Sequence, residues 1–256
     1  MVRIYLYDIR DFPGFPDMNI DTAAGSMALI SEARRERAGA YLRGPDKIRC
    51  LAAGLLLRRV CGITDDRQLT YGENGKPYIK GGGVYFNISH GGNYVVLAAA
   101  DREVGVDVEQ VAPYSQAIAA RVFTQAEREW MRQKGEGCEG REGRGGRDEG
   151  AGCNEGAVHY ECDEAFYRLW TAKESVMKAA GLGFALPPET FCVLSAIKGD
   201  ALKIAGKSWF LDLMHHDGHI ICSAIADRRE KEYALSLITD LPGLRREVNM
   251  ILPGLL

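Results

Sequence analysis

The chain has 256 residues, 46% of them hydrophobic, and its 32 basic and 35 acidic residues give a formal charge of −3. This size allows a substantial core in one large domain or two smaller halves, and the near-neutral charge excludes general attraction to nucleic acid or anionic membranes. Seven cysteines without a Cys-x-x-Cys pair, no signal peptide and no apolar run of the roughly 20 residues that span a bilayer predict a soluble cytoplasmic protein.

The N-terminal region begins with a predicted strand and continues into a basic helical segment. Residues 1–12 alternate apolar and polar side chains, as a strand does. Residues 46–60 place apolar side chains at helical spacing, and Gly62 follows the predicted helix end. The basic side chains here suit either a solvated helix face or a ligand with several phosphates. They are Arg34, Arg35, Arg37, Arg43, Lys47 and Arg49.

Two strands and a turn are predicted in the middle of the chain. Lys76 lies in a Gly-Lys-Pro turn, and residues 84–88 alternate as a strand that runs into His90 and two glycines. His90 either caps this turn or helps to bind an anion. Residues 94–100 are almost wholly apolar, which predicts a buried central strand.

The sequence Val-Gly-Val-Asp-Val-Glu at residues 104–109 carries a candidate metal site. Strict alternation places the valines on one strand face, and Asp107 and Glu109 on the other, roughly 6.6 Å apart at a ~3.3 Å rise per residue. Two carboxylates at that spacing can reach one Mg²⁺ ion. Water and substrate phosphate would complete the coordination shell of the ion. The alternative is an exposed strand face with ordinary acidic residues.

A third carboxylate candidate lies at a predicted helix start. Thr124 and Glu127 have the spacing of a capping box, in which each side chain satisfies a backbone donor near the other. The functional alternative has Glu127 turning toward the ion at Asp107 and Glu109. The glycine-rich, charged residues 135–156 follow, and their composition predicts a mobile surface loop.

The second strong helical pattern covers residues 163–180. Glu174 and Lys178 are four residues apart and therefore share one helix face. They form either a solvated surface pair or, opposite a metal–phosphate site, a base or metal ligand and a phosphate-binding ammonium group.

A weak internal repeat predicts the architecture. Residues 90–102, HGGNYVVLAAADR, resemble residues 216–228, HDGHIICSAIADR, and each segment is preceded at a distance by one of the long helices. We therefore predict an α+β fold of two similar halves, residues 1–110 and 111–256, related by a pseudo-twofold axis. Each half would be a small sheet packed by a long helix, with a site between them.

In this order, several segments resemble the 4'-phosphopantetheinyl transferase family, and most closely its larger pseudo-dimeric type. The resemblance rests on GKPYI, FNISHGG, GVDVE, FTQAERE and LWTAKESVMKAAG, between Lys76 and Gly181. It implies transfer of the 4'-phosphopantetheine arm of coenzyme A to a serine of an apo carrier protein, with release of 3',5'-ADP. Coenzyme A and the carrier would be the partners of a monomeric enzyme, with no role for nucleic acid or a membrane.

The resemblance also implies roles for individual residues. Asp107, Glu109 and Glu127 would hold Mg²⁺, and Glu127 or Glu174 would take the proton from the carrier serine. Phosphate and nucleotide contacts would come from a basic set of His90, Lys178, Arg34, Arg37, Arg49 and Lys76. Two departures from the family pattern are Gly91, where a serine often follows the histidine, and the glycine-rich segment before the second long helix.

Two other functions remain compatible with the residues themselves. One is a Mg²⁺-dependent nuclease or nucleotide phosphohydrolase that uses Asp107 and Glu109. The other is a non-catalytic module that binds coenzyme A or a carrier protein.

Overall fold

A computed structural model describes residues 1–16, 24–139, 155–227, 232–238 and 247–253 of the chain. The strands are β1 (Val2–Asp8), β2 (Leu69–Tyr71), β3 (Pro77–Ile79), β4 (Tyr85–Gly91), β5 (Tyr94–Ala100), β6 (Val104–Gln110), β7 (Leu202–Ile204), β8 (Lys207–His216), β9 (His219–Ala226), β10 (Glu232–Ile238) and β11 (Glu247–Pro253). The α-helices are α1 (Ala24–Met27), α2 (Glu32–Ala40), α3 (Gly44–Cys61), α4 (Gln116–Val122), α5 (Gln125–Glu139) and α6 (Glu155–Ala180).

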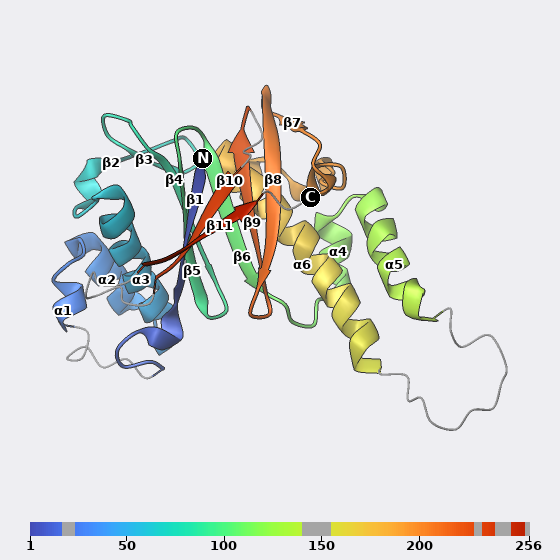
Figure 1. The fold of residues 1–256 in the computed structure, drawn as a ribbon, viewed down its shortest axis with the longest axis horizontal. Helices are drawn as coiled ribbons and strands as arrows, with labels where there is room; N and C mark the ends of the chain where they lie inside the picture. The colour runs from blue at the N-terminus through green and yellow to red at the C-terminus, as the bar shows by residue number, and fades with distance from the viewer. Residues whose placement is uncertain (17–23, 140–154, 228–231, 239–246, 254–256) are drawn as a thin grey trace.

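The fold is mixed α and β and is built in layers. One sheet has the order β11-β10-β1-β5-β4 and a second has the order β6-β9-β8-β7, while β2 and β3 form a separate ribbon. Helices α1–α3 lie outside the first sheet and α4–α6 outside the second (Figure 1). Apolar side chains from both sheets, including Leu6, Val96, Val106 and Ile221, form a shared core between them. Among the described residues, no helix is long and apolar enough to cross a membrane.

The two apolar runs of the repeat are central strands, as the sequence predicts. Every residue of β5 and β9 is buried. In β5, alternate side chains pack into different cores. Val95 and Leu97 belong to the core on the α3 side, and Val96 and Ala98 belong to the core shared with the second sheet. A strand covered on both faces is mostly apolar along its whole length, which is why neither run alternates.

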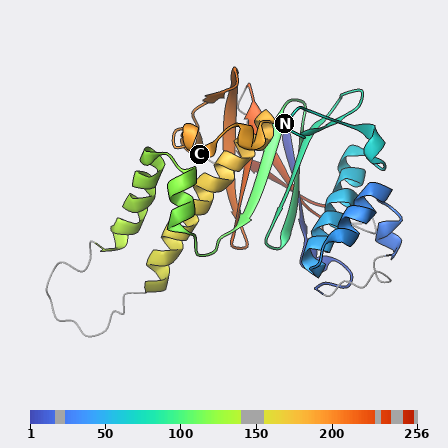
Figure 2. The ribbon, with the colours of Figure 1, turned by 180° about the vertical axis from the view of Figure 1, so that it is seen from behind.

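Strand β6 confirms the predicted alternation. Val104, Val106 and Val108 are fully buried in the core between the sheets. The opposite face meets α6, which crosses β6 directly over Gly105 (Figure 2). A β-carbon on Gly105 would lie 2.1 Å from the carbonyl oxygen of Ser175, so only glycine permits this close approach.

Both predicted long helices are present. Helix α3 ends at Cys61 and α6 at Ala180, and each is followed by a glycine in the left-handed conformation, Gly62 or Gly181. Both ends of the segment 135–156, which the sequence predicts to be a loop, are helical, because α5 continues to Glu139 and α6 begins at Glu155. Helix propagation adds one hydrogen bond per residue and offsets the weak helix propensity of the glycines at these ends. Residues 140–154 lie outside the described residues.

The predicted division at residue 110 does not follow the sheets. Strand β6 continues from the first sheet's β4–β5 hairpin but pairs with β9 of the second sheet. Strand β10 continues from the second sheet's β8–β9 hairpin but pairs with β1 of the first. The two hairpins are thus each followed by a strand that joins the other sheet. The sheets are not equal, since the described residues form five strands in one and four in the other. The relation between two equal halves therefore stays a prediction.

Candidate active site

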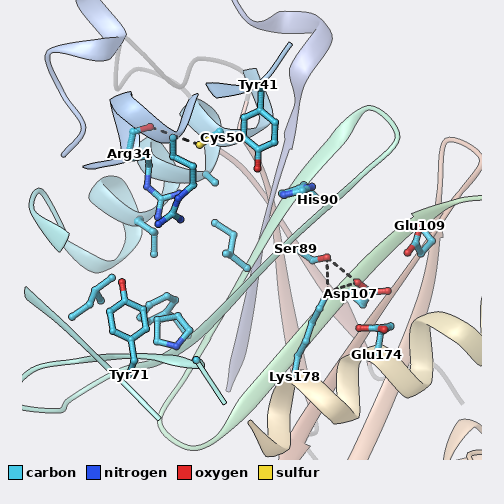
Figure 3. Close-up of a pocket in the computed structure, with 18 of the residues that line it drawn as sticks. Arg34, Tyr41, Cys50, Tyr71, Ser89, His90, Asp107, Glu109, Glu174 and Lys178 are labelled. Atoms are coloured by element: carbon cyan, nitrogen blue, oxygen red, sulfur yellow. Dashed lines mark hydrogen bonds and ion pairs between the residues drawn. The ribbon is translucent and has the colours of Figure 1, made fainter. Parts of the chain in front are cut away.

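A cavity of about 590 Å³ opens between the first helical layer and the β6–α6 contact (Figure 3). Its two ends differ in charge: arginines and tyrosines gather at one end, and carboxylates with a lysine at the other. The lining residues are Arg34, Arg37, Tyr41, Cys50, Ala53, Leu57, Leu69, Tyr71, Gly75, Pro77, Phe86, Ile88, Ser89, His90, Asp107, Glu109, Trp170, Glu174 and Lys178.

Asp107 is the centre of the acidic end. Its side chain is almost fully buried, and its Oδ1 atom accepts hydrogen bonds from Ser89 Oγ at 2.8 Å and Lys178 Nζ at 2.5 Å. The other oxygen, Oδ2, is buried and has no hydrogen-bond partner among the described residues. A buried carboxylate oxygen without a donor is costly, so this atom is suited to a ligand or an ion that the protein itself does not supply.

Glu109 and Glu174 complete the acidic end, from β6 and α6 respectively. Burial and the negative charges of Asp107 and Glu174 together raise the pKa of Glu109 to about 7. A hydrogen bond from Trp170 Nε1 at 3.2 Å and the charge of Lys178 act in the opposite direction. Burial also raises the pKa of Glu174; the charge of Lys178 lowers this pKa, and the charge of Asp107 raises it. Three carboxylates that repel one another in a partly enclosed site favour a proton or a cation between them.

The donor set is of the type that Mg²⁺ takes, namely carboxylate oxygens with open space for water and phosphate. Within the described ranges, no three His, Cys, Asp or Glu side chains are preassembled as a metal-binding group. The ammonium group of Lys178 instead rests on Asp107. The unpartnered Oδ2 atom and the raised pKa values of Glu109 and Glu174 nonetheless fit a divalent cation at this end of the cavity.

Glu127 does not lie in this cavity. Its side chain is fully buried, pairs with Lys173 Nζ at 2.8 Å, and accepts hydrogen bonds from the backbone N–H groups of Thr124 and Val193, each at 2.8 Å. The capping box with Thr124 is present, and its geometry turns the carboxylate back toward its own helix start. The structure thus does not bring Glu127 to Asp107 and Glu109, and Glu174 lies there instead.

The helical spacing of α6 explains why Glu174 lies in the cavity and Glu127 does not. Glu174 and Lys178 share the face that lines the cavity, as their four-residue spacing predicts. Lys173 precedes Glu174 by one residue and therefore points about 100° away, into the core. Its ammonium group donates to the carbonyl oxygens of Pro188 and Phe191 and requires a buried counterion, which Glu127 provides.

The predicted basic contacts divide into two groups. Arg34, Arg37, His90 and Lys178 line the cavity. Enclosure in the cavity lowers the pKa of His90, and the charges of Arg49 and Lys178 lower it further.

Arg49 and Lys76 do not line the cavity. Arg49 donates from Nε (3.0 Å) and Nη2 (2.5 Å) to the carbonyl oxygen of Gly92 and pairs with Asp46. Lys76 is buried, and its ammonium group bonds Glu103 at 2.5 Å and the carbonyl oxygen of Ala179 at 2.6 Å. Both side chains therefore bind carbonyl and carboxylate oxygens of the protein itself and do not reach the cavity.

Some lining residues carry no clear signal in the sequence. Tyr41 and Tyr71 flank the basic end, and Trp170 holds Glu109. Ser89 belongs to a polar strand end that suits an anion, but its hydroxyl donates to Asp107. Isolated aromatic residues on a loop and a short strand have no diagnostic spacing, so only the fold identifies them.

These features define a class: a protein whose cavity is suited to an anionic ligand, with basic groups at one end and carboxylates at the other. The sequence model of the "4'-phosphopantetheinyl transferase superfamily" matches residues 103–237, and the chain belongs to this family.

Two similar proteins come from Bacillus subtilis. A 4'-phosphopantetheinyl transferase is 28% identical over 223 residues, which cover 84% of each chain. The 4'-phosphopantetheinyl transferase Sfp of strain 168 is 30% identical over 173 residues, covering 65% of this chain and 67% of the relative.

A third similar protein comes from Xenopus laevis. Its L-aminoadipate-semialdehyde dehydrogenase-phosphopantetheinyl transferase is 30% identical over 175 residues, covering 60% of this chain and 50% of the relative. The protein is thus a phosphopantetheinyl transferase, an enzyme that transfers phosphopantetheine to carrier proteins. Of the functions compatible with the sequence, this one is supported over the nuclease, phosphohydrolase and binding-module alternatives.

Proposed function

We propose that the cavity binds coenzyme A together with Mg²⁺, and that it is the site from which the 4'-phosphopantetheine arm passes to a serine of an apo carrier protein. The observation that carries this proposal is the division of one cavity into a basic end and an end with three carboxylates. A coenzyme A molecule has phosphates in two places, on the ribose and in the pyrophosphate. Basic side chains can bind one of them directly, and carboxylates can bind the other through Mg²⁺.

At the acidic end, Asp107, Glu109 and Glu174 would hold the metal ion. This set replaces the one expected from the sequence, since Glu127 is committed to Lys173. When bound, Mg²⁺ would neutralise negative charge on the pyrophosphate oxygens. The unpartnered Oδ2 atom of Asp107 supports this assignment, because it is the buried acceptor that the protein leaves unused.

At the basic end, Arg34 and Arg37 would hold the nucleotide phosphate, and His90 would provide a further phosphate contact in the same cavity. Lys178 lies at the acidic end and already donates to Asp107 and Ser89. In the complex its ammonium group would contact the phosphate that reacts and stabilise charge as it develops.

The reaction itself exchanges one phosphorus–oxygen bond for another. The carrier serine oxygen attacks the phosphorus attached to the pantetheine arm, the bond to the bridging oxygen breaks, and 3',5'-ADP leaves with the bonding electrons. Glu174 would take the serine proton. It lies at the end of the cavity where the phosphate would react, so it would accept the proton directly or through a water molecule.

The test is to incubate the protein with coenzyme A, Mg²⁺ and an apo carrier protein and to measure the mass of the carrier. Asp107→Ala should abolish the mass increase while leaving the fold intact. Asp101→Ala provides a matched control, because Asp101 lies just after β5 and is exposed, and it should retain full activity.

The same assay separates the alternatives. Release of 3',5'-ADP without a carrier would indicate a hydrolase. Coenzyme A binding without carrier modification would indicate a binding module. Near-normal transfer by Asp107→Ala would remove this end of the cavity from the mechanism.

A further inference from the structure

The turn between β4 and β5 is enclosed by the second sheet. It consists of Gly92 and Asn93, and it follows His90 and Gly91, the last two residues of β4. A β-carbon on Gly91 would lie 2.3 Å from the carbonyl oxygen of Val108 in β6. One on Gly92, whose φ is +52°, would lie 2.1 Å from His219 Nε2. The turn therefore has no room to move toward β6 or β9.

His219 is the first residue of β9, and it is almost completely buried. Its Nε2 atom accepts a hydrogen bond from the backbone N–H of Asn93 at 3.3 Å, and its Nδ1 atom lies 2.7 Å from the carbonyl oxygen of Asp217. An amide N–H can only donate and a carbonyl can only accept. His219 must therefore be neutral, with its proton on Nδ1.

The surroundings of His219 support a neutral ring. Burial lowers its pKa, the charges of Arg10 and His216 lower it further, and Asp217 opposes them. The ring packs edge-on against Tyr94, whose hydroxyl donates to Asp217. The imidazole is thus fixed by contacts on β5 and on the β8–β9 turn.

The same turn is held from the opposite layer. Arg49 of α3 donates two hydrogen bonds to the carbonyl oxygen of Gly92, while His219 of β9 accepts a hydrogen bond from the backbone N–H of Asn93. One peptide group is thus fixed at both its ends, by a helix outside the first sheet and by a strand of the second. His90, two residues before the turn, lines the cavity.

We propose that His219 is a positioning residue for coenzyme A binding: through Asn93 it holds the β4–β5 turn where His90 faces the cavity. The inference rests on the proposed function of the cavity. It gives Arg49 a related task, since this arginine holds the turn and does not line the cavity. His219 itself does not touch the ligand.

The test compares His219→Leu with His219→Gln by calorimetric titration of coenzyme A, together with kcat and KM for transfer. Leucine removes the acceptor, and the affinity for coenzyme A should fall roughly five- to tenfold, while kcat at saturating coenzyme A stays within about twofold. Glutamine offers an amide oxygen near the place of Nε2 and should restore most of the affinity. His215→Gln, an exposed histidine on β8, is the matched control and should bind normally.

Unchanged affinity in His219→Leu, or equal weakening in the leucine and glutamine variants, would overturn the proposal. If His219→Leu does not fold, Gly92→Ala pushes the turn away from an intact imidazole, and normal affinity there would overturn the proposal as well. His90→Ala tests the underlying function separately. If His90→Ala binds coenzyme A normally, His90 is not a ligand contact, and the proposed role of His219 is overturned with it. If His90→Ala weakens binding and His219→Leu does not, the cavity binds coenzyme A as proposed and only the positioning role is wrong.

Discussion

Glu109 is the acidic residue whose charge depends most directly on what the cavity contains. With a pKa of about 7, raised by burial and by Asp107 and Glu174, it is partly protonated near neutral pH in the absence of a cation. The unfolded chain would ionise the same group near pH 4.5. The folded, metal-free protein therefore binds an extra proton between these two values.

The first prediction follows from that difference. Because the folded-state pKa is raised, the stabilisation from protonated Glu109 is present at low pH and is lost as pH rises from about 4.5 to about 7. The glutamine in Glu109→Gln cannot ionise, so the stability of this variant does not have this pH dependence. In metal-free buffer, the melting temperature of the native protein should therefore decline relative to that of Glu109→Gln over this range. Parallel curves would show that Glu109 ionises normally.

The second prediction concerns the buried Glu127–Lys173 pair, in which both side chains are fully buried. Lys173→Met leaves a buried carboxylate without its cation and should cost about 3–5 kcal/mol of the free energy of unfolding. Adding Glu127→Gln should recover most of this loss. Chemical denaturation of the native protein, both single variants and the double variant would measure the coupling. Additive effects would contradict a direct ion pair.

At the scale of elements, the contact between β6 and α6 brings the acidic end together. Strand β6 supplies Asp107 and Glu109, and helix α6 supplies Glu174 and Lys178. Gly105 lets the two elements touch, since a β-carbon there would lie 2.4 Å from the backbone nitrogen of Ala179. The glycine is therefore as necessary to the site as the side chains that line it.

The third prediction is that Gly105→Ala lowers kcat on the order of 10²-fold, because α6 must move away from β6 and displacements of about 1 Å at a reacting centre have that effect. Gly39→Ala is the matched control. Gly39 lies in α2, and a β-carbon there would have nothing within 4 Å, so alanine should be neutral or slightly stabilising. Transfer rates and melting temperatures of both variants would be compared. A fully active Gly105→Ala would show that the helix tolerates the shift.

Elements with a clear periodic signal were predictable from the sequence. The alternation in β6, the continuous burial of β5 and both long helices follow from apolar spacing alone. The exchange of β6 and β10 between sheets could not be predicted, because pairing depends on contacts between residues far apart in sequence. Likewise, the spacing of Thr124 and Glu127 indicates a capping box, but not that Lys173 would claim the same carboxylate in the core.

At the scale of the whole molecule, the strand exchange joins the two sides into one unit. Each sheet contains a strand that continues from a hairpin of the other, and apolar residues of both sheets fill a common core. The cavity needs both sides as well, since Arg34 and His90 come from one and Glu174 and Lys178 from the other. Separate unfolding of one side would therefore dismantle the other.

The fourth prediction is a single cooperative unfolding transition. Leu51 is fully buried in α3 on the first sheet's side, whereas the chain's three tryptophans, Trp130, Trp170 and Trp209, all belong to the second side's core or pack against it. Leu51→Ala should cost about 2–5 kcal/mol and should lower the melting temperature reported by tryptophan fluorescence. A tryptophan signal unaffected by Leu51→Ala, or two calorimetric transitions, would show that the sides unfold independently.

The central claim is that Glu174, and not Glu127, completes the carboxylate set with Asp107 and Glu109. The most direct measurement is the Mg²⁺ concentration that gives half-maximal transfer at saturating coenzyme A, for Glu174→Gln and Glu127→Gln. Removing a ligand charge should raise that concentration roughly tenfold or more in Glu174→Gln. In Glu127→Gln, assayed well below its melting temperature, the concentration should stay within about twofold of the native value. A raised Mg²⁺ requirement in Glu127→Gln with a normal one in Glu174→Gln would contradict the account.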